Sequence, residues 1–160
     1  MNRKFMIAAA SAAMFALSAT AFAQQPGQSG TAAEAKAMLA KAITAVKADK
    51  AKAIAMFNSG EGGFKDRDLY PFCANFSDGK LIANSNTKQL LGQDGRTFKD
   101  ATGHNFGQEL YDAAAKAKEG EAVETTTFLF PRPGADTTPV AKVAFVERAG
   151  DIYCGVGYYK

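Results

Sequence analysis

The two cysteines of this chain constrain its fold more than any other feature, because they mark its first and its last strand-like segments. Cys73 lies in an aromatic and apolar run over residues 69–76, and a Ser-Asp-Gly turn then leads into a second apolar run. This pattern is typical of a β-hairpin. Cys154 lies in the aromatic segment 151–159 near the end of the chain. We interpret the two segments as neighbouring strands at the centre of a small sheet.

The amino-terminal 23 residues resemble an export signal. Arg3 and Lys4 precede an apolar run over residues 5–16, and Ala-Phe-Ala ends at residue 23, which is the pattern of a secretory cleavage site. The segment is too short to span a bilayer, and no later stretch is long and apolar enough to do so; the alternative is an uncleaved anchor. We therefore predict a signal peptide over 1–23, a disordered lead-in over 24–30 and a single domain over 31–160, located in the periplasm or secreted.

Composition and motifs exclude several functional classes. Without Arg3 and Lys4, 17 of the 19 basic residues remain against 16 acidic ones, so the formal charge falls from +3 to +1. A nearly neutral chain lacks the basic stripe of a nucleic-acid binder. The single histidine, His104, has no cysteine partners at metal-ligand spacing, and no nucleophile motif or phosphate-binding loop is present. We expect no nucleic-acid partner, no metal, no cofactor and no catalytic residue.

The redox state of the cysteines follows from the predicted compartment. Exported proteins meet an oxidising environment in which paired cysteines form disulfides, so we predict a disulfide between Cys73 and Cys154. The competing interpretation is a reactive thiol that serves an enzyme as its nucleophile. A cysteine inside an apolar strand, however, lacks the exposed and electropositive surroundings that activate a thiol.

The periodicity of the other segments predicts an α+β fold. Apolar residues at spacings of three, four and seven predict an amphipathic helix over 31–57, which Asp49-Lys50 could divide, and a second helix over 106–118. The first helix should cover one face of the sheet; the alternative is a coiled-coil partner. The irregular segment 84–105 should form a lid or binding loop that packs on the domain. Further strands are predicted over 122–130, 140–148 and 151–158. Because hairpins join the strands, the sheet should be antiparallel.

Strand alternation indicates where a pocket lies. A two-residue turn at Ala149-Gly150 would pair Ala144 with Gly155, and successive side chains of each strand point to opposite faces. If Cys73 and Cys154 are bonded, the residues that alternate with Cys73 join the face of Ala144. We define the glycine face as Tyr70, Phe72, Ala74, Lys142, Ala144, Tyr153, Gly155 and Gly157. Its glycines leave room for the close approach of a packed helix or a ligand.

Lys142 is the single cation on the glycine face. A buried ammonium without a counter-charge is too costly to keep charged, and a ligand carboxylate would supply that charge. Two other interpretations stay open: Lys142 pairs with a protein carboxylate, or it reaches solvent at the end of its strand. Arg132, in a Pro-Arg-Pro-Gly turn, could reach over the mouth of such a pocket. The candidate ligand-binding residues are Tyr70, Phe72, Arg132, Lys142, Ala144, Tyr153 and Gly155.

Several segments, taken in their order along the chain, resemble the single Cache domain (type 2) of bacterial extracellular sensing. After a leading helix they are Asp68-Leu69-Tyr70-x-Phe72-Cys73, Asp78-Gly79, Ala83-Asn84, Gly103-His104-Asn105-Phe106, Phe130-Pro131-Arg132-Pro133, 142–146 and 155–160. The resemblance covers nearly the whole chain after the predicted signal. The chain departs from the family in having phenylalanine, and no tryptophan, before Pro131, and in a first hairpin that is one residue longer than usual.

The resemblance implies a PAS-like five-stranded antiparallel sheet with its first strand beside its last, a long N-terminal helix on one face, and a lid plus short helices on the other. It further implies a pocket between sheet and lid that binds small molecules, often short carboxylates. Because the sequence ends at Lys160 without a fused signalling module, we expect an exported binding or sensing module that serves a separate membrane sensor or transporter. The alternative is an exported protein-interaction or structural module with no small ligand.

Overall fold

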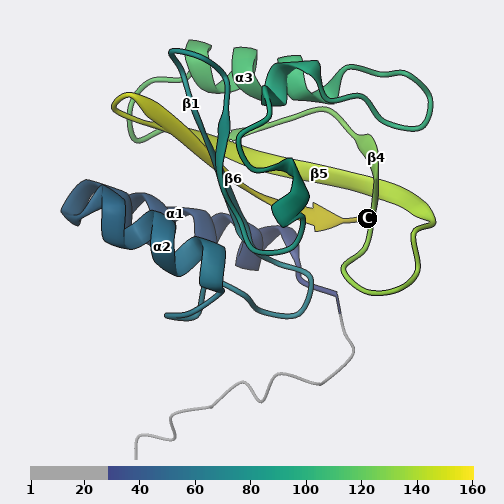
Figure 1. The fold of residues 1–160 in the computed structure, drawn as a ribbon, viewed down its shortest axis with the longest axis horizontal. Helices are drawn as coiled ribbons and strands as arrows, with labels where there is room; N and C mark the ends of the chain where they lie inside the picture. Colours follow the sequence, from purple (N-terminus) through teal and green to yellow (C-terminus); the bar gives the residue numbers. More distant parts are fainter. Residues whose placement is uncertain (1–28) are drawn as a thin grey trace, which may run out of the picture.

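An antiparallel sheet, covered on both faces, forms the centre of the molecule (Figure 1). The computed structural model describes residues 29–160, so the predicted signal peptide (1–23) and residues 24–28 of the predicted lead-in lie outside the described residues. The strand order is β2-β1-β6-β5, and both β3 and β4 pair with the other edge of β5. The predicted α+β fold with an antiparallel sheet is therefore confirmed, although the sheet within residues 29–160 has six strands and not the predicted five, because β3 and β4 share one edge of β5. The strands are β1 (Pro71–Asn75), β2 (Leu81–Asn84), β3 (Val123–Glu124), β4 (Phe128–Pro131), β5 (Pro139–Ala149) and β6 (Ile152–Tyr159).

The first strand lies beside the last, as predicted, and the cysteines join them. Cys73 of β1 is directly opposite Cys154 of β6, and their sulfurs form a disulfide. Both residues are fully buried. The bond spans a sequence separation of 81 residues, so it restricts the unfolded chain strongly. The predicted disulfide is confirmed, and the interpretation of either cysteine as a reactive thiol is wrong.

The turn between β5 and β6 is Gly150-Asp151 and not Ala149-Gly150, so Ala144 pairs with Gly157. Gly150 has a φ of +62°, which the first central residue of a type II′ turn requires. The predicted register is therefore wrong by two residues along the partner strand. Since side chains alternate with a period of two, every residue nevertheless stays on its predicted face.

Helices α1 (Ala32–Ala48) and α2 (Lys50–Ser59) cover the face of the sheet that carries the disulfide. Thr31 caps α1 and forms a capping box with Glu34. Asp49 has an extended backbone that ends α1, and its side chain caps α2, so the division of the helix at this point is confirmed. The side chains that these helices bury against the sheet include Leu39, Ile43 and Phe57.

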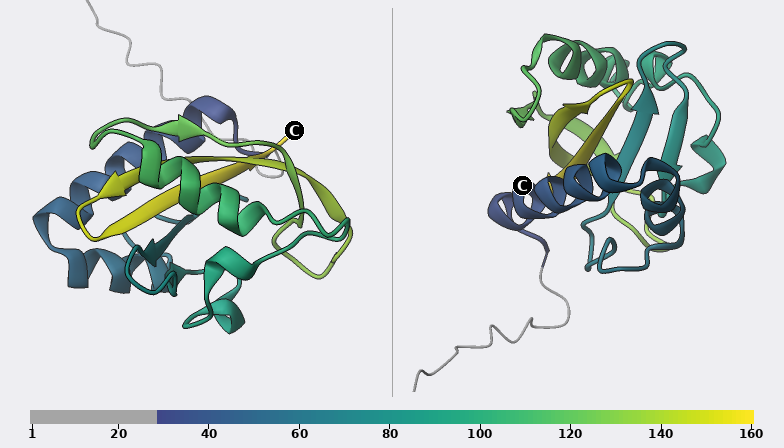
Figure 2. Two further views of the ribbon diagram at one scale, coloured as in Figure 1. Left: turned by 90° about the horizontal axis from the view of Figure 1, so that it is seen from above. Right: turned by 90° about the vertical axis from the view of Figure 1, so that its left-hand side faces the viewer.

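The opposite face is covered by α3 and by the lid over residues 84–105 (Figure 2). The lid packs on the domain as predicted. An added Cβ at Gly107 of α3 would collide with the carbonyl oxygen of Gly95, so this glycine allows the lid backbone to touch the helix. The elements of this layer are η1 (Lys88–Leu90), η2 (Gly95–Thr97) and α3 (Phe106–Lys116).

The segment 122–130, predicted as one strand, forms the two short strands β3 and β4. Between them, the hydroxyl of Thr125 donates to the carbonyl of Ala144 and accepts from its N–H. Thr126 donates its hydroxyl to Glu109 of α3. The N–H of Thr125 still donates to the carbonyl of Ala144, but the Thr125 hydroxyl takes the N–H of Ala144 and Thr126 bonds to α3. The ladder is therefore interrupted, and the prediction of a continuous strand is wrong in its middle.

The described chain begins where it is tied to the domain. The N–H of Gly30 donates to Asp68 at 2.7 Å, and the hydroxyl of Ser29 accepts from Arg132 at 2.6 Å. The sequence assigns both residues to the disordered lead-in. Their contacts show that these two residues of the predicted lead-in are held against the domain.

Removal of the disulfide should lower the free energy of unfolding. For Cys73→Ala/Cys154→Ala, the chain-entropy model gives a loss of about 4 kcal/mol for so long a loop. Denaturant unfolding of the oxidised wild type and the double variant measures the difference. Reductant should reproduce the loss in the wild type and have no effect on the variant. An unfolding midpoint that stays constant after complete reduction would contradict the prediction.

Candidate functional site

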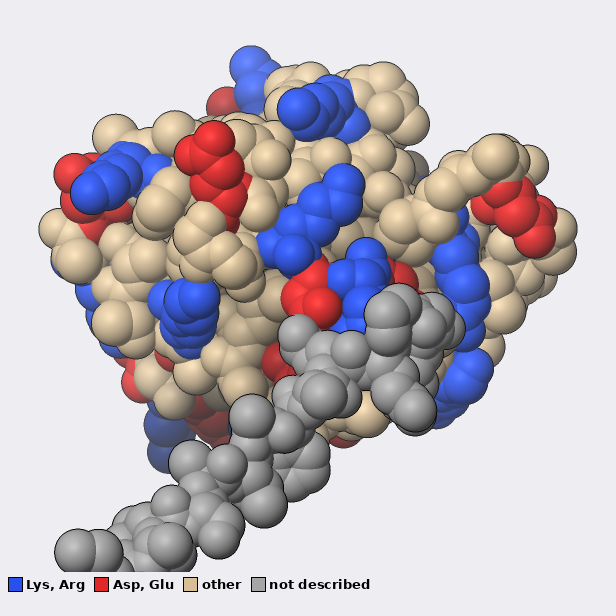
Figure 3. All heavy atoms as spheres, turned by 90° about the horizontal axis from the view of Figure 1, so that it is seen from below, with Lys and Arg blue, Asp and Glu red and all other residues tan. Residues whose placement is uncertain are grey.

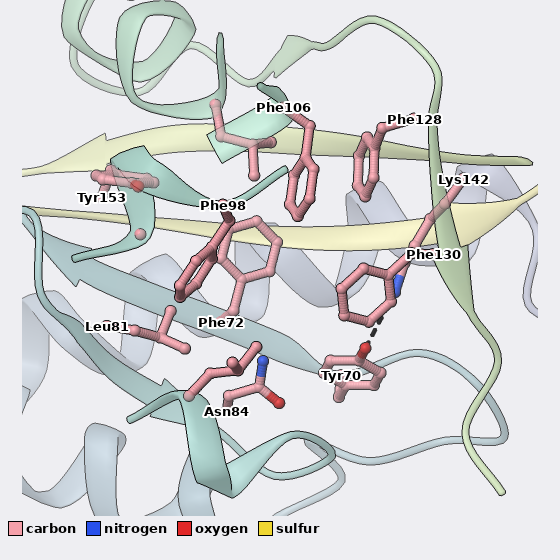
Figure 4. A pocket seen from close by; sticks show the side chains of 13 residues that line it. Tyr70, Phe72, Leu81, Asn84, Phe98, Phe106, Phe128, Phe130, Lys142 and Tyr153 are labelled. Atoms are coloured by element: carbon pink, nitrogen blue, oxygen red, sulfur yellow. Dashed lines mark hydrogen bonds between the residues drawn. The ribbon is translucent and has the colours of Figure 1, made fainter. Parts of the chain in front are cut away.

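A cavity of about 60 Å³ lies between the glycine-face side of the sheet and the cover of α3 and lid (Figure 4). Pockets for drug-sized ligands usually measure roughly 300–1,000 Å³, so this cavity suits a molecule of few heavy atoms. Its polar side chains are Tyr70, Asn84, Lys142 and Tyr153. We define its aromatic wall as Phe98, Phe106, Phe128 and Phe130.

Lys142 lies at one end of the cavity, beside Tyr70 and Phe130 (Figure 4). Its Nζ donates to the hydroxyl of Tyr70 at 3.0 Å and to that of Tyr159 at 3.3 Å. The ring centroids of Tyr70, Phe130 and Tyr159 lie 4.7, 5.0 and 4.6 Å from Nζ. Lys142 is only 5% exposed, and none of the ion pairs within residues 29–160 includes it. It therefore neither reaches solvent nor pairs with a described carboxylate.

Burial controls the charge of the polar groups at this end of the cavity. Desolvation lowers the pKa of Lys142 to about 7, because it disfavours the ammonium form. The charge of Asp68 opposes this shift in pKa, and the charge of Arg132 adds to it. Burial also raises the pKa of Tyr70 to about 12, so its hydroxyl stays protonated. Near neutral pH, Lys142 can therefore gain or lose a proton while its hydroxyl neighbours remain neutral.

The two hydroxyls beside Lys142 differ in where their protons go. Tyr159 donates its proton to the carbonyl oxygen of Pro131 at 2.6 Å. Tyr70 accepts from Lys142, since an ammonium group has no acceptor, and the side chain of Asn86 is a further hydrogen-bond partner of its hydroxyl. Lys142 and Tyr70 thus place an amine and a hydroxyl side by side at this end of the cavity.

The cavity includes some of the candidate residues and not others. Tyr70, Phe72, Lys142 and Tyr153 line it, whereas Ala144, Gly155 and Arg132 are not among its lining residues. Arg132 pairs instead with Asp68 at 2.7 Å. Strand alternation therefore placed four candidates on the correct side of the sheet, but not every residue of that face reaches the cavity.

The glycines of the glycine face are covered by the protein itself. An added Cβ at Gly155 would collide with the ring of Phe72, and one at Gly157 would collide with the side chain of Lys142. The close approach predicted at these glycines is therefore made by two side chains of the same face, and not by a packed helix or a ligand. Phe72 and Lys142 line the cavity, whereas the two glycines that they cover do not.

The aromatic wall was missed in the sequence because it comes from separate elements. Phe98 belongs to the lid, Phe106 to α3, and Phe128 and Phe130 to β4. Phe106 and Phe128 stack with centroids 4.5 Å apart. The apolar face of the predicted helix 106–118 was a signal that it covers the sheet, but nothing in its period indicates which strand it meets.

Two polar contacts were also missed. Tyr159 is the cross-strand partner of Lys142, which the two-residue error in register concealed. Asn84 lies in the cavity lining, and its side-chain oxygen accepts from the backbone N–H groups of Asn86 and Thr87 at 2.9 and 2.8 Å. It thereby shapes the start of the lid. The motif Ala83-Asn84 was the signal available for it.

The part of the chain that the structure describes gives little support for a metal site or a membrane span. Within residues 29–160, no group of three or more His, Cys, Asp or Glu residues could hold a metal ion. His104 instead contacts Glu109 at 2.7 Å, and this hydrogen bond raises the pKa of the imidazole. The described helices include none with the length and apolar content needed to cross a membrane.

Comparison with known proteins adds a family and a set of structural relatives. A family model described as Single Cache domain 2 matches residues 10–159, and no curated protein matches the chain. A methyl-accepting chemotaxis protein from Vibrio parahaemolyticus has a TM-score of 0.62 at 22% identity, over 79% of this chain and 86% of that one. A periplasmic sensor domain of a chemotaxis protein has a TM-score of 0.58 at 19% identity, over 78% and 87%. A Cache chemosensory domain described for its carboxylic acid recognition has a TM-score of 0.58 at 21% identity, over 78% and 85%.

The lowered pKa of Lys142 predicts that stability depends on pH. Its pKa of about 7 in the folded state is below the usual value of about 10.4. Between these values the unfolded chain binds more protons, so the free energy of unfolding should rise with pH. Between about pH 7 and about pH 9.5, deprotonation of Lys142 should raise the free energy of unfolding by up to about 3 kcal/mol.

Lys142→Met should remove this rise, because methionine keeps the apolar stem and lacks the amine. Denaturant unfolding of both proteins over the same pH range measures it. His104, whose pKa is raised by its hydrogen bond to Glu109, is present in both proteins, so the comparison of the two slopes cancels its contribution. Equal slopes in the wild type and the variant would contradict the assignment.

Proposed function

Because this chain belongs to the Single Cache domain 2 family, we propose that it is a binding module whose cavity holds a small organic anion. The carboxylate accepts hydrogen bonds from Lys142 and Tyr70, and the rest of the ligand lies against the aromatic wall. Tyr153 closes the far end of the cavity (Figure 4). In this proposal the module binds and presents its ligand without chemical conversion.

The observation that carries the proposal is the state of Lys142. Lys142 is buried and lines the cavity. It takes part in no described ion pair, so no carboxylate of the described residues neutralises its ammonium form by direct contact. An ammonium buried without a counter-charge is costly, and a bound carboxylate supplies one. The ligand thus stabilises the charged form of Lys142, and Lys142 stabilises the ligand.

The remainder of the lining supports a monocarboxylate with a short apolar tail. Phenylalanine and leucine side chains dominate the cavity away from Lys142. A second carboxylate on the ligand would be buried against this apolar surface without a cation, which is unfavourable. A solved structural relative is described as recognising a carboxylic acid, which agrees with this ligand class.

The proposal also includes a location and a partner. We place the module in the periplasm or outside the cell, after cleavage of a signal peptide over residues 1–23 from the domain over 31–160. Another structural relative is a periplasmic sensor domain of a chemotaxis protein, which supports this compartment. The partner would be a membrane sensor or transporter that recognises the ligand-bound module.

Thermal shift assays with acetate, propionate, butyrate and succinate test the ligand class. A ligand at about 100 times its Kd adds about 2.7 kcal/mol of stability, which should raise the Tm by roughly 5 °C or more for a domain of this size. We expect this shift with one of the monocarboxylates and not with succinate. If no monocarboxylate raises the Tm, the proposed ligand class is wrong, and an interaction module without a small ligand becomes the better explanation.

Two lysine variants locate the site. Lys142→Met should abolish the Tm response, because it removes the ammonium from the cavity. Lys99→Met is the matched control, since Lys99 is an exposed lysine of the lid and its loss should leave the response unchanged. An equal response in Lys142→Met and the wild type would exclude Lys142 as the anion contact.

A further inference from the structure

An ion pair between Asp68 and Arg132 lies outside the cavity, at the point where the described chain begins. Its nitrogen–oxygen distance is 2.7 Å, and Asp68 is buried. The other oxygen of Asp68 accepts from the N–H of Gly30, and Arg132 also donates to Ser29. Figure 3 shows acidic and basic side chains next to one another on the face of the molecule that is seen from below. Neither Asp68 nor Arg132 contributes to the cavity lining.

The turn that carries Asp68 is held in place on both sides. Asp66 and Leu69 exchange two backbone hydrogen bonds of 3.0 and 2.8 Å. Arg67, between them, has a φ of +54°, which is uncommon for a residue with a side chain. Its guanidinium group pairs with Asp66 at 2.8 Å and with Glu34 at 2.7 Å. Such a backbone persists only where its surroundings hold it, so the position of Asp68 is fixed by this turn.

Tyr159 connects the ion pair to the cavity. The Cζ atom of Arg132 lies 4.4 Å from the centroid of the Tyr159 ring, and the Nζ atom of Lys142 lies 4.6 Å from the same centroid. The hydroxyl of Tyr159 accepts from Lys142 and donates to the carbonyl of Pro131, which precedes Arg132. Two cations therefore share one aromatic ring, and one of them has a permanent counter-ion.

The charges of the pair act on Lys142 in opposite directions. Asp68 raises the pKa of Lys142 and Arg132 lowers it. The other groups that face Lys142 are the hydroxyls of Tyr70 and Tyr159 and the ring of Phe130. Burial raises the pKa of both tyrosines, so they are uncharged near pH 7. The lining also contains Tyr153, whose pKa is raised by burial as well.

We propose that Asp68 and Arg132 are positioning residues that act from outside the cavity on the charge of Lys142, and so define the pH range in which the cavity binds an anion. The part of this inference that concerns ligand affinity rests on the proposed function. The part that concerns the protonation of Lys142 does not, because it can be measured without a ligand. Because the two charges act in opposite directions, loss of the Asp68 charge should lower the pKa of Lys142 and loss of the Arg132 charge should raise it.

Titration of the lysine side-chain signals by NMR in the ligand-free protein tests the inference, with Lys142→Met to assign the signal. Asp68→Asn should lower the titration midpoint of Lys142 by about half a pH unit or more, and Arg132→Gln should raise it by a similar amount. The double variant should titrate between the two single variants and below the wild type, because Asp68 has the larger effect on the pKa of Lys142. Both single variants break the same ion pair, so a purely structural role would move both midpoints in one direction or leave both unchanged, and either result would overturn the proposal.

Conservative variants separate charge from folding. Asparagine at position 68 can still accept the N–H of Gly30, and Arg132→Lys keeps a positive charge, so Arg132→Lys should titrate like the wild type. If Asp68→Asn fails to fold, the comparison of Arg132→Gln with Arg132→Lys decides the question. A midpoint that shifts equally in these two variants would overturn the proposal, because only one of them removes the charge.

Calorimetric titration with propionate across pH 6–9 adds the functional arm. An anion that needs the ammonium form should bind about tenfold more weakly for each pH unit above the midpoint of Lys142. Asp68→Asn should therefore lose affinity at a lower pH than the wild type and regain it on acidification, and Arg132→Gln should retain it to a higher pH. If opposite midpoint shifts occur but no monocarboxylate binds the wild type, the control of Lys142 stands and the proposed function fails.

Discussion

The disulfide between β1 and β6 determines which side chains share each face of the sheet. It places Cys73 directly opposite Cys154, and so fixes the register of the two central strands. Side chains alternate along each strand, so Phe72 and Tyr153, each one position away, point to the opposite face and line the cavity. A slip of one residue would exchange the two faces. A bond buried beneath α1 therefore decides what lines a cavity on the other side of the sheet.

Some features of this site follow from the alternation of side chains along a strand, whereas others depend on the exact turn between two strands. Face assignment needs only parity, and for this reason Lys142 and Tyr153 were placed correctly although their register was wrong. The cross-strand partner of Lys142 needs the exact turn, and the type II′ preference for glycine at its first central position moved that partner to Tyr159. Local turn chemistry thus decided a contact in the site that periodicity could not.

The glycines of the glycine face show a second limit of prediction from the sequence. Small residues indicate that something approaches closely, but they do not say what. Here Phe72 covers Gly155 and the stem of Lys142 covers Gly157, so the space is filled by neighbours on the same face. The cavity is lined by these covering side chains together with the aromatic wall, in which Phe106 of α3 stacks on Phe128 of β4. Contacts of this kind depend on how separate elements pack, and a single sequence carries no direct signal of it.

The chemistry of the two cations explains why each occupies its position. An arginine keeps its proton at all pH values that proteins meet, so an arginine facing an empty apolar cavity would remain a buried, unpaired charge. Arg132 avoids this cost because Asp68 is its permanent counter-ion. A lysine can release its proton when the cavity is empty and recover it when an anion arrives. In the proposed function, the titratable cation thus faces the space that the ligand would fill, and the permanently charged Arg132 is paired with a carboxylate of the protein itself.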